Sequence, residues 1–245
     1  MGIHLLEKVM HWVLNPDGSI SVDDPDIIKT FTDDTYFPYL VSFPRTGSHW
    51  LRMIMELYFE KPSLVRVFYF RNSSEFTCFH THDMDLNLQR RNVIYLYRNV
   101  VDTVYSQLRY YKEDPDNQER QRYWTNLYAQ HISKWLINDD FTCKKTVITY
   151  EGMRSDMHGE IKKLCMHFGV NFDPLKLNSV LAHVSKDELK KKTKHDQQVV
   201  NLTDAYEYEK EMFRKKYAKS IIDDFVSAET SLERIVNMWL SDINI

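Results

Sequence analysis

Residues 39–52, YLVSFPRTGSHWLR, constrain the fold of this chain more than any other segment. Residues 39–43 form the apolar run of a short buried strand, and residues 44–48 form a tight loop that contains one glycine. A helical spacing of apolar residues follows directly. A strand, a short loop and a helix in this order direct unpaired backbone N–H groups at an anion. The segment therefore predicts a phosphate-binding loop, to which Arg45 adds a positive charge and Ser48 a hydroxyl.

The rest of the chain alternates between strand-like and helix-like patterns. Further strands are expected at residues 64–70, 75–81, 92–97 and 145–150, and helices at residues 100–111, 119–136, 155–168, 174–184 and 205–238. Residues 92–97, NVIYLY, are nearly all apolar, which indicates a strand in the middle of a parallel sheet. These patterns predict a three-layer α/β fold with a central, mostly parallel sheet and a helical C-terminal third.

Composition narrows the class of protein. With 245 residues, 43% of them hydrophobic, and no polar or Pro/Gly-rich linker, residues 1–245 are expected to form a single domain. The net charge of −3 argues against nonspecific nucleic-acid binding, which needs excess positive charge. No apolar run approaches the ~20 residues of a membrane span. The three cysteines are odd in number and lack metal-ligand spacing, so we expect reduced thiols in a cytoplasmic protein.

A second motif follows the strand at residues 92–97. Residues 98–106, RNVVDTVYS, place Arg98 just after the carboxyl end of that strand and Ser106 about two helical turns farther along. Ligands of doubly wound sheets bind at such strand ends, and an arginine there suits a phosphate. A helix-capping ion pair between Arg98 and Asp102 is the alternative, and we expect Asp102 to be structural in either case.

The two motifs together resemble the sulfotransferases that use 3′-phosphoadenosine 5′-phosphosulfate (PAPS). That family has a loop of the type Pro-Lys/Arg-Ser/Thr-Gly-Ser/Thr-x-Trp-Leu for the 5′-phosphosulfate and a motif Arg-Asn-x-x-Asp-x-x-x-Ser for the 3′-phosphate. Here residues 44–51 read PRTGSHWL and residues 98–106 read RNVVDTVYS. The resemblance continues through residues 147–153, VITYEGM, and fades beyond about residue 170. It implies a nucleotide-binding core at about residues 38–170, PAPS as donor co-substrate, the 3′,5′-bisphosphate PAP as product, and no metal.

The resemblance also implies roles for individual loop residues. Arg45 takes the place of the cation that neutralises the bridging oxygen of the donor as it leaves. Gly47 and Ser48 take the contacts to the 5′-phosphate, and Thr46 and His49 belong to the same donor-binding loop. The backbone amide of His49 can face the phosphate, whereas its ring has no assigned role.

Further donor contacts follow from the same resemblance. Arg98 and Ser106 occupy the positions that bind the 3′-phosphate in that family. Trp50 takes an aromatic position that packs against the adenine, with a place in the helix core as the alternative interpretation. Tyr150 matches a tyrosine that reaches the adenine in cytosolic members of the family.

Residues 79–83, FHTHD, supply the candidate general base. Cytosolic sulfotransferases carry a catalytic histidine in a Lys-Thr-His sequence at the matching place, which implies that His82 removes the proton from the acceptor hydroxyl. His80 replaces the lysine of that sequence. We expect the imidazoles of His80 and His82 to point to opposite faces of the strand, which disfavours the alternative of a metal site with Asp83. A purely polar strand-end role for His82 is the second alternative.

The third motif of the cytosolic members, an Arg-Lys-Gly clamp on the 3′-phosphate, is absent from this chain. Basic residues that would replace it occur in two places: Lys190, Lys191, Lys192 and Lys194, and the run Arg214, Lys215 and Lys216. We expect residues 186–204 to form a mobile lid over the donor, although such a charge run is more often a solvated face.

Taken together, these patterns predict sulfuryl transfer from PAPS to a hydroxyl or amine of a small-molecule or carbohydrate acceptor. His82 and Arg45 are the expected catalytic residues. A P-loop-related small-molecule kinase is an alternative, disfavoured because the Gly-Lys-Ser/Thr ending of a Walker A loop is absent. An inactive nucleotide-binding member of the fold is another, because the third motif is missing. Neither nucleic acid nor a membrane is an expected partner, and a homodimer is compatible with this interpretation.

Overall fold

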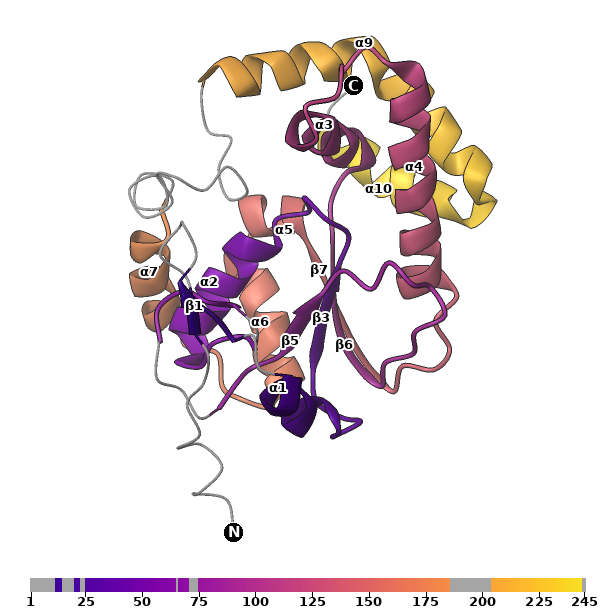
Figure 1. The fold of residues 1–245 in the computed structure, drawn as a ribbon. Coiled ribbons are helices and arrows are strands. Elements are labelled where there is room, and N and C mark those ends of the chain that lie inside the picture. Colours follow the sequence, from indigo (N-terminus) through magenta and orange to yellow (C-terminus); the bar gives the residue numbers. More distant parts are fainter. Residues whose placement is uncertain are drawn as a thin grey trace.

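Four parallel strands form the central sheet, in the order β5-β3-β6-β7 (Figure 1). The structure, a computed structural model, describes residues 12–14, 20–22, 25–64, 66–70, 75–185 and 204–243. The strands of the central sheet are β3 (Tyr39–Ser42), β5 (Phe79–Thr81), β6 (Asn92–Tyr97) and β7 (Lys144–Thr149). Every residue of β3 and β6 is buried, as expected for apolar strands in the middle of a parallel sheet.

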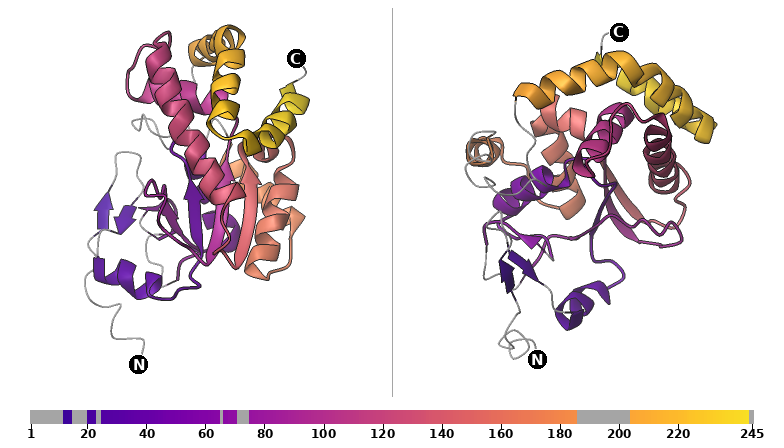
Figure 2. Two further views of the ribbon diagram at one scale, coloured as in Figure 1. Left: turned by 90° about the vertical axis from the view of Figure 1, so that its right-hand side faces the viewer. Right: turned by 45° about the horizontal axis from the view of Figure 1, so that its top comes forward.

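Helices cover both faces of this sheet (Figure 2). One face packs on α2 (Ser48–Phe59), α5 (Tyr150–Ser155), α6 (Met157–Phe168) and α7 (Pro174–His183). The other packs on α3 (Val100–Tyr110), α4 (Gln118–Ile132), α9 (Asp204–Ala228) and α10 (Glu233–Ile243). Alternate residues of the strands supply the two cores: Leu40 and Ile94 face the first set of helices, and Val41 and Tyr95 the second. The predicted three-layer α/β fold is confirmed.

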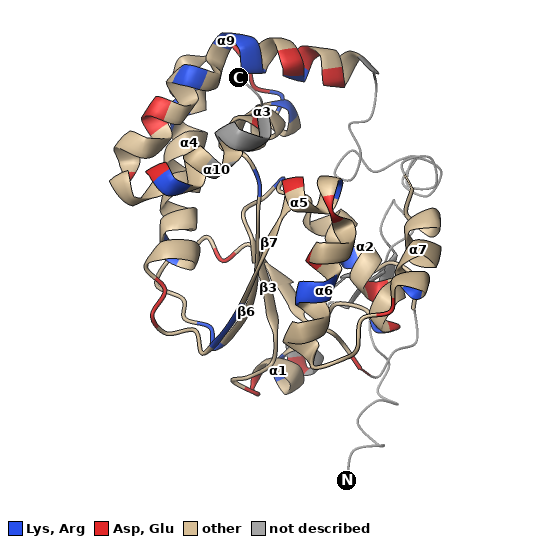
Figure 3. Ribbon diagram, turned by 180° about the vertical axis from the view of Figure 1, so that it is seen from behind, with Lys and Arg blue, Asp and Glu red and all other residues tan. Residues whose placement is uncertain are grey.

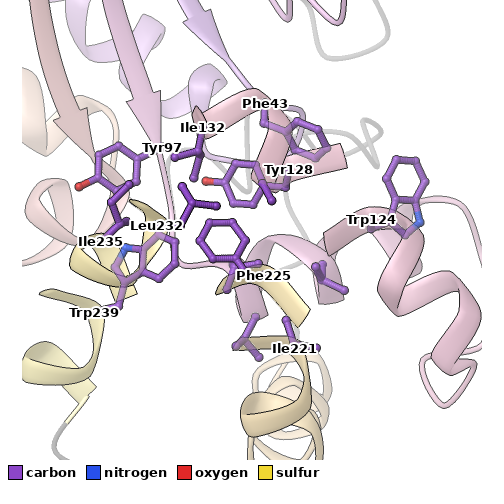
Figure 4. Close-up of a cluster of buried hydrophobic side chains, with 14 of the residues drawn as sticks. Phe43, Tyr97, Trp124, Tyr128, Ile132, Ile221, Phe225, Leu232, Ile235 and Trp239 are labelled. Atoms are coloured by element: carbon purple, nitrogen blue, oxygen red, sulfur yellow. The ribbon is translucent and has the colours of Figure 1, made fainter. Parts of the chain in front are cut away.

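The helical C-terminal third closes the second core. The buried side chains of α9 and α10 belong to this core, where Phe225 packs beside Tyr128 and Trp239 packs beside Phe225 and Tyr97 (Figure 4). Basic and acidic residues are interspersed along the rest of α9 (Figure 3). The helix expected at residues 205–238 is instead two helices, separated by a 3₁₀ turn (Thr230–Leu232). Glu229 adopts extended backbone before that turn, and this break lets α10 fold back toward Tyr97.

Smaller elements complete the described part of the chain. They are an antiparallel sheet of β1 (Trp12–Leu14), β2 (Ile20–Val22) and β4 (Arg66–Val67), the helix α1 (Pro25–Thr32), and a π-helical turn (Ser133–Ile137) at the end of α4. None of the helices described has the length and apolarity that a membrane span requires. Residues 186–203 of the expected lid, with the four lysines at 190–194, lie outside the described residues.

A buried carboxylate explains why the strand expected at residues 64–70 is short. Glu56 of α2 is fully buried and accepts hydrogen bonds from the backbone N–H groups of Phe68 (2.8 Å), Tyr69 (2.5 Å) and Phe70 (2.7 Å). These donors are therefore not available to a neighbouring strand, and β4 ends at Val67. Residues 75–81 likewise form a strand only over Phe79–Thr81.

Replacing this carboxylate with its neutral amide tests the role of Glu56 in the fold. Glu56→Gln leaves one acceptor oxygen and turns an amide N–H₂ toward backbone donors. We expect the free energy of unfolding, measured by urea denaturation, to fall by about 1–3 kcal/mol. Glu60→Gln, at the C-cap of the same helix, is the control, because Glu60 is exposed in an ion pair with Lys176. Equal stability of the two variants would contradict this role.

Candidate functional site

The candidate site lies where the four parallel strands end. The loop at residues 43–47 follows β3, His82 follows β5, Arg98 follows β6, and Tyr150 follows β7. Parallel strands place their carboxyl ends at one edge of the sheet, so these four segments meet there. The chain passes from β3 to β5 on one side and returns to β6 on the other, which makes this edge the topological switch point of the sheet.

Gly47 allows the loop after β3 to fold tightly against Tyr150. Its φ of 98° lies in the left-handed region, which favours glycine. A Cβ atom at this position would come within 2.5 Å of the Tyr150 ring. Ser48, which is buried, begins α2 directly after this glycine. The first N–H groups of α2 therefore lie at the loop, as an anion site requires.

Arg45 is the cation of this loop. Its φ of 72° is uncommon for a residue with a side chain. The guanidinium donates from Nε to Ser106 Oγ (3.3 Å) and lies 4.9 Å from the centre of the Tyr110 ring. These contacts place Arg45 and Ser106, which come from the two sequence motifs, against each other.

Thr46 of the loop and His49 in the first turn of α2 use their side chains within the protein. Thr46 is fully buried and donates from Oγ1 to the carbonyl of Phe43 (2.7 Å), so its hydroxyl closes the turn. The ring of His49 packs edge-on against Phe68, with 5.9 Å between ring centres. Any contact of Thr46 with the expected co-substrate would therefore come from its backbone. The imidazole of His49 has a packing role.

Arg98 is a buried cation that faces the loop. It donates from Nη2 to Asp102 (3.0 Å) and from Nη1 to the carbonyl of Arg45 (3.3 Å). Its guanidinium carbon lies 4.2 Å from the centre of the Tyr150 ring. The Nε atom is buried and has no hydrogen-bond partner among the residues described. A buried hydrogen-bond donor without a partner costs free energy, and an anion that accepts from Arg98 Nε would remove that cost.

Asp102 joins Arg98 to the C-terminal third of the chain. Both Nε and Nη2 of Arg214, on α9, donate to its carboxylate at 2.6 Å. Burial alone would raise the pKa of Asp102, but Arg98 and Arg214 outweigh it and lower that pKa to about 2. The Arg98–Asp102 ion pair, considered above as the alternative role of Arg98, is present, and Arg214 pairs with the same carboxylate.

The aromatic residues assigned to the adenine lie together. The ring centres of Trp50 and Tyr150 are 5.9 Å apart in an edge-to-face arrangement. Trp50 is half-buried against the core beneath α2, so its position agrees with both interpretations offered for it. Glu151 accepts a hydrogen bond from the Asn99 backbone N–H (3.0 Å), which gives this carboxylate a structural role.

The expectation that His80 and His82 point to opposite faces is wrong. Their ring centres are 4.9 Å apart, and both imidazoles contact Ser42 at the end of β3. Residues two apart in a strand share a face, which is the reason for this arrangement. Asp83 turns away into an ion pair with Arg90. The described residues contain no group of three potential metal ligands.

Hydrogen bonds assign distinct tautomers to the two histidines. His82 Nδ1 lies 2.7 Å from the carbonyl oxygen of Ser42, which only accepts, so Nδ1 carries the proton and Nε2 the lone pair. His80 Nδ1 lies 3.4 Å from Arg52 Nη1, which only donates, so the proton of His80 is on Nε2, facing Ser42 Oγ (3.2 Å). Burial lowers the pKa of His82, and Arg52 and Arg45 lower it further against the effect of the Ser42 carbonyl. His82 is therefore neutral at pH 7, with Nε2 as its basic atom.

Sequence reasoning missed two polar residues beside the site. Arg52 is buried, donates from Nε to Ser63 Oγ (2.7 Å) and contacts His80. Gln107 is fully buried and donates to the carbonyl of Pro44 in the loop (2.9 Å). Each stands among the apolar residues of a buried helix face, and that interruption of the pattern is the signal that could have identified them.

Comparisons with known proteins identify the family. The family model of the sulfotransferase domain matches residues 70–229, which include the motif at residues 98–106 but begin after the loop. Mouse sulfotransferase SULT7A1 complexed with PAP has a TM-score of 0.57 and 16% sequence identity, over 91% of this chain and 97% of that one. Retinol dehydratase in complex with androsterone and inactive cofactor PAP has a TM-score of 0.53 and 13% identity, over 89% and 90%. No curated protein sequence matches.

The two solved structures are too distant in sequence to show more than a common fold, and that fold agrees with the family match. Because the family model covers more than half of the chain, this protein belongs to the sulfotransferase domain family.

Proposed function

We propose that this sulfotransferase moves the sulfuryl group from PAPS to a hydroxyl, or an amine, of a small-molecule or carbohydrate acceptor. One observation carries the proposal: the four parallel strands end directly before the loop at residues 43–47, His82, Arg98 and Tyr150, the groups to which the proposal gives a role. Two cations, Arg45 and Arg98, a helix N-terminus and a neutral imidazole therefore meet at one edge of the sheet.

The donor fits the groups present at this edge. The start of α2 and the loop would bind the 5′-phosphosulfate, and the buried Nε of Arg98 offers a hydrogen bond to the 3′-phosphate. Trp50 and Tyr150 would contact the adenine. Two relatives of the same fold were solved with PAP, which supports a donor of this kind.

The residues of the site would divide the reaction between them. His82 accepts the acceptor's proton at Nε2 while the acceptor oxygen forms a bond to sulfur. The bond between sulfur and the bridging oxygen breaks, and Arg45 neutralises the charge that develops on the PAP leaving group. Catalysis would rest on positioning and charge neutralisation, and no step needs a metal.

The acceptor class and the cellular location stay predictions. A small-molecule acceptor is supported by the relative solved with androsterone, although the chain shares only the fold with it. The three cysteines are free and two of them are buried, which agrees with the reduced, cytoplasmic environment expected from the sequence.

Removal of the imidazole tests the role of His82. His82→Ala should lower kcat by roughly 10²- to 10⁴-fold and leave PAP affinity unchanged, because the base acts on the acceptor. Transfer would be measured with radiolabelled PAPS against phenols, aliphatic alcohols, glycans and glycolipids, and PAP binding by calorimetry. His183→Ala, at an exposed histidine of α7, is the control. Full activity of His82→Ala would refute the assignment, and PAP binding by the wild type without any transfer would indicate an inactive member of the fold.

The lowered pKa of His82 predicts the pH dependence of the reaction. Protonation of Nε2 removes the base, so activity is lost as pH falls through the pKa of the folded protein. Because that pKa lies below the ordinary value of about 6.5, we expect the acidic limb of kcat/KM for the donor to lie below pH 6.5. The residual activity of His82→Ala should lack this limb. A limb above pH 6.5 would contradict the environment described for His82.

Loss of the Arg98 guanidinium tests the 3′-phosphate site. Arg98→Met should weaken the binding of PAP by roughly 10- to 100-fold and that of adenosine 5′-phosphate much less, because only PAP carries the 3′-phosphate. Arg214 would still pair with Asp102, so the buried carboxylate would keep a partner. Arg109→Met, at an exposed arginine of α3, is the control. Equal losses for both nucleotides would overturn the assignment.

A further inference from the structure

Two fully buried polar residues of α4 face the candidate site. Tyr128 and His131 are three residues apart, so they project from the same side of the helix, and neither is exposed to solvent. A purely apolar side chain would fill the core at either position without the cost of burying a polar group. The hydrogen bonds of these two residues therefore indicate what each polar group does.

Tyr128 binds both backbone groups of Arg98. Its hydroxyl accepts a hydrogen bond from the Arg98 N–H (2.9 Å) and donates to the Arg98 carbonyl (2.6 Å). Arg98 follows the last residue of β6, where the strand ladder ends. The hydroxyl takes the place of a neighbouring strand at this residue, and it fixes the backbone from which the guanidinium projects.

His131 binds the backbone of His82 in a comparable way. Its Nε2 lies 2.8 Å from the His82 carbonyl oxygen, so Nε2 carries the proton, and Nδ1 accepts from the Tyr95 hydroxyl (3.0 Å). Burial lowers the pKa of His131 to about 4, and the ring is neutral at pH 7. His82 follows the last residue of β5, so His131 holds it beyond the end of its strand.

Phe43, the first residue of the phosphate-binding loop, packs between the two. Its ring centre lies 4.8 Å from that of Tyr128 and 5.5 Å from that of His131 (Figure 4 shows Phe43 beside Tyr128). The Phe43 carbonyl also accepts the hydrogen bond from Thr46 that closes the loop. One face of α4 thus touches the loop, the arginine and the histidine.

We propose that α4 sets the distance between the general base and the donor site, with His131 positioning His82 and Tyr128 positioning Arg98. The catalytic consequence rests on the function proposed above, in which His82 acts on the acceptor and Arg98 on the donor. Because a misplaced base slows the chemical step whereas a misplaced arginine weakens donor binding, the two positioning residues should have separable effects.

Substitution of His131 tests the first half of the proposal. His131→Phe removes the donor to the His82 carbonyl and should lower kcat by roughly 10- to 100-fold, with PAP affinity within about twofold of the wild type. His131→Gln can still donate to that carbonyl and should recover most of the loss. His167→Phe is the matched control, because His167 is a buried histidine of α6 that hydrogen-bonds Thr146 away from the site.

Substitution of Tyr128 tests the second half. Tyr128→Phe removes both hydrogen bonds to Arg98 and should weaken PAP binding by roughly tenfold, with a smaller change in kcat. Tyr58→Phe is the matched control, since the buried Tyr58 hydroxyl accepts from the backbone of Asp173 (2.7 Å) on the other face of the sheet. Parallel losses of kcat and PAP affinity in His131→Phe and Tyr128→Phe, or equal losses in the controls, would overturn the proposal.

A measurement that does not depend on turnover tests the positioning role of His131 independently of the proposed function. The imidazole of His82 can be titrated by NMR in histidine-labelled protein and assigned with His82→Ala. His131→Phe should shift the His82 titration, and His167→Phe should not. An unshifted His82 titration refutes the positioning role whether or not the wild type transfers sulfuryl groups. A shifted titration in a protein that transfers none supports the positioning role and refutes only the function.

Discussion

The burial of the Arg98 guanidinium is the interaction on which the arrangement of the site depends. A cation removed from water is tolerated only where opposite charge and hydrogen bonds surround it. Asp102 supplies that charge from the first turn of α3, and it binds Arg214 of α9 through the same carboxylate. The end of β6 and two helices from distant parts of the sequence are thereby held together. Arg98 is left facing the carbonyl of Arg45 in the loop after β3.

Two other arginines, Arg45 and Arg52, affect the protonation state of His82. Burial keeps His82 neutral, and the positive charges of Arg52 and Arg45 favour the neutral form further. In the proposed reaction Arg45 would serve twice, because the charge that neutralises a leaving phosphate also keeps the nearby base unprotonated. His82 and the loop at residues 43–47 are linked through Ser42, whose carbonyl accepts the hydrogen bond from His82 and which immediately precedes the loop. A shift of β3 would therefore move both.

The parts predicted from the sequence are those in which local pattern and chemistry agree. The apolar run at residues 92–97 is the observed β6, and Arg98 and Asp102 form the ion pair that was considered as an alternative. Prediction failed where a distant side chain decided the backbone. Glu56 binds the N–H groups of residues 68–70 and so prevents a longer strand there. The error on His80 and His82 had another cause, since the two-residue period of a strand places such residues on one face.

The sequence by itself determined the fold class, the strand–loop–helix segment proposed to bind phosphate, and which residues are candidates for catalysis, because periodicity, a single glycine and short motifs are properties of neighbouring residues. Only the tertiary structure decided which of those residues lie together and in which protonation state. The proton on His82 is placed by the carbonyl of Ser42, and His131 reaches the His82 backbone across 49 residues. Such contacts depend on how the helices pack on the sheet. Packing brings together residues that are far apart in the sequence, and no local sequence pattern indicates that they will touch.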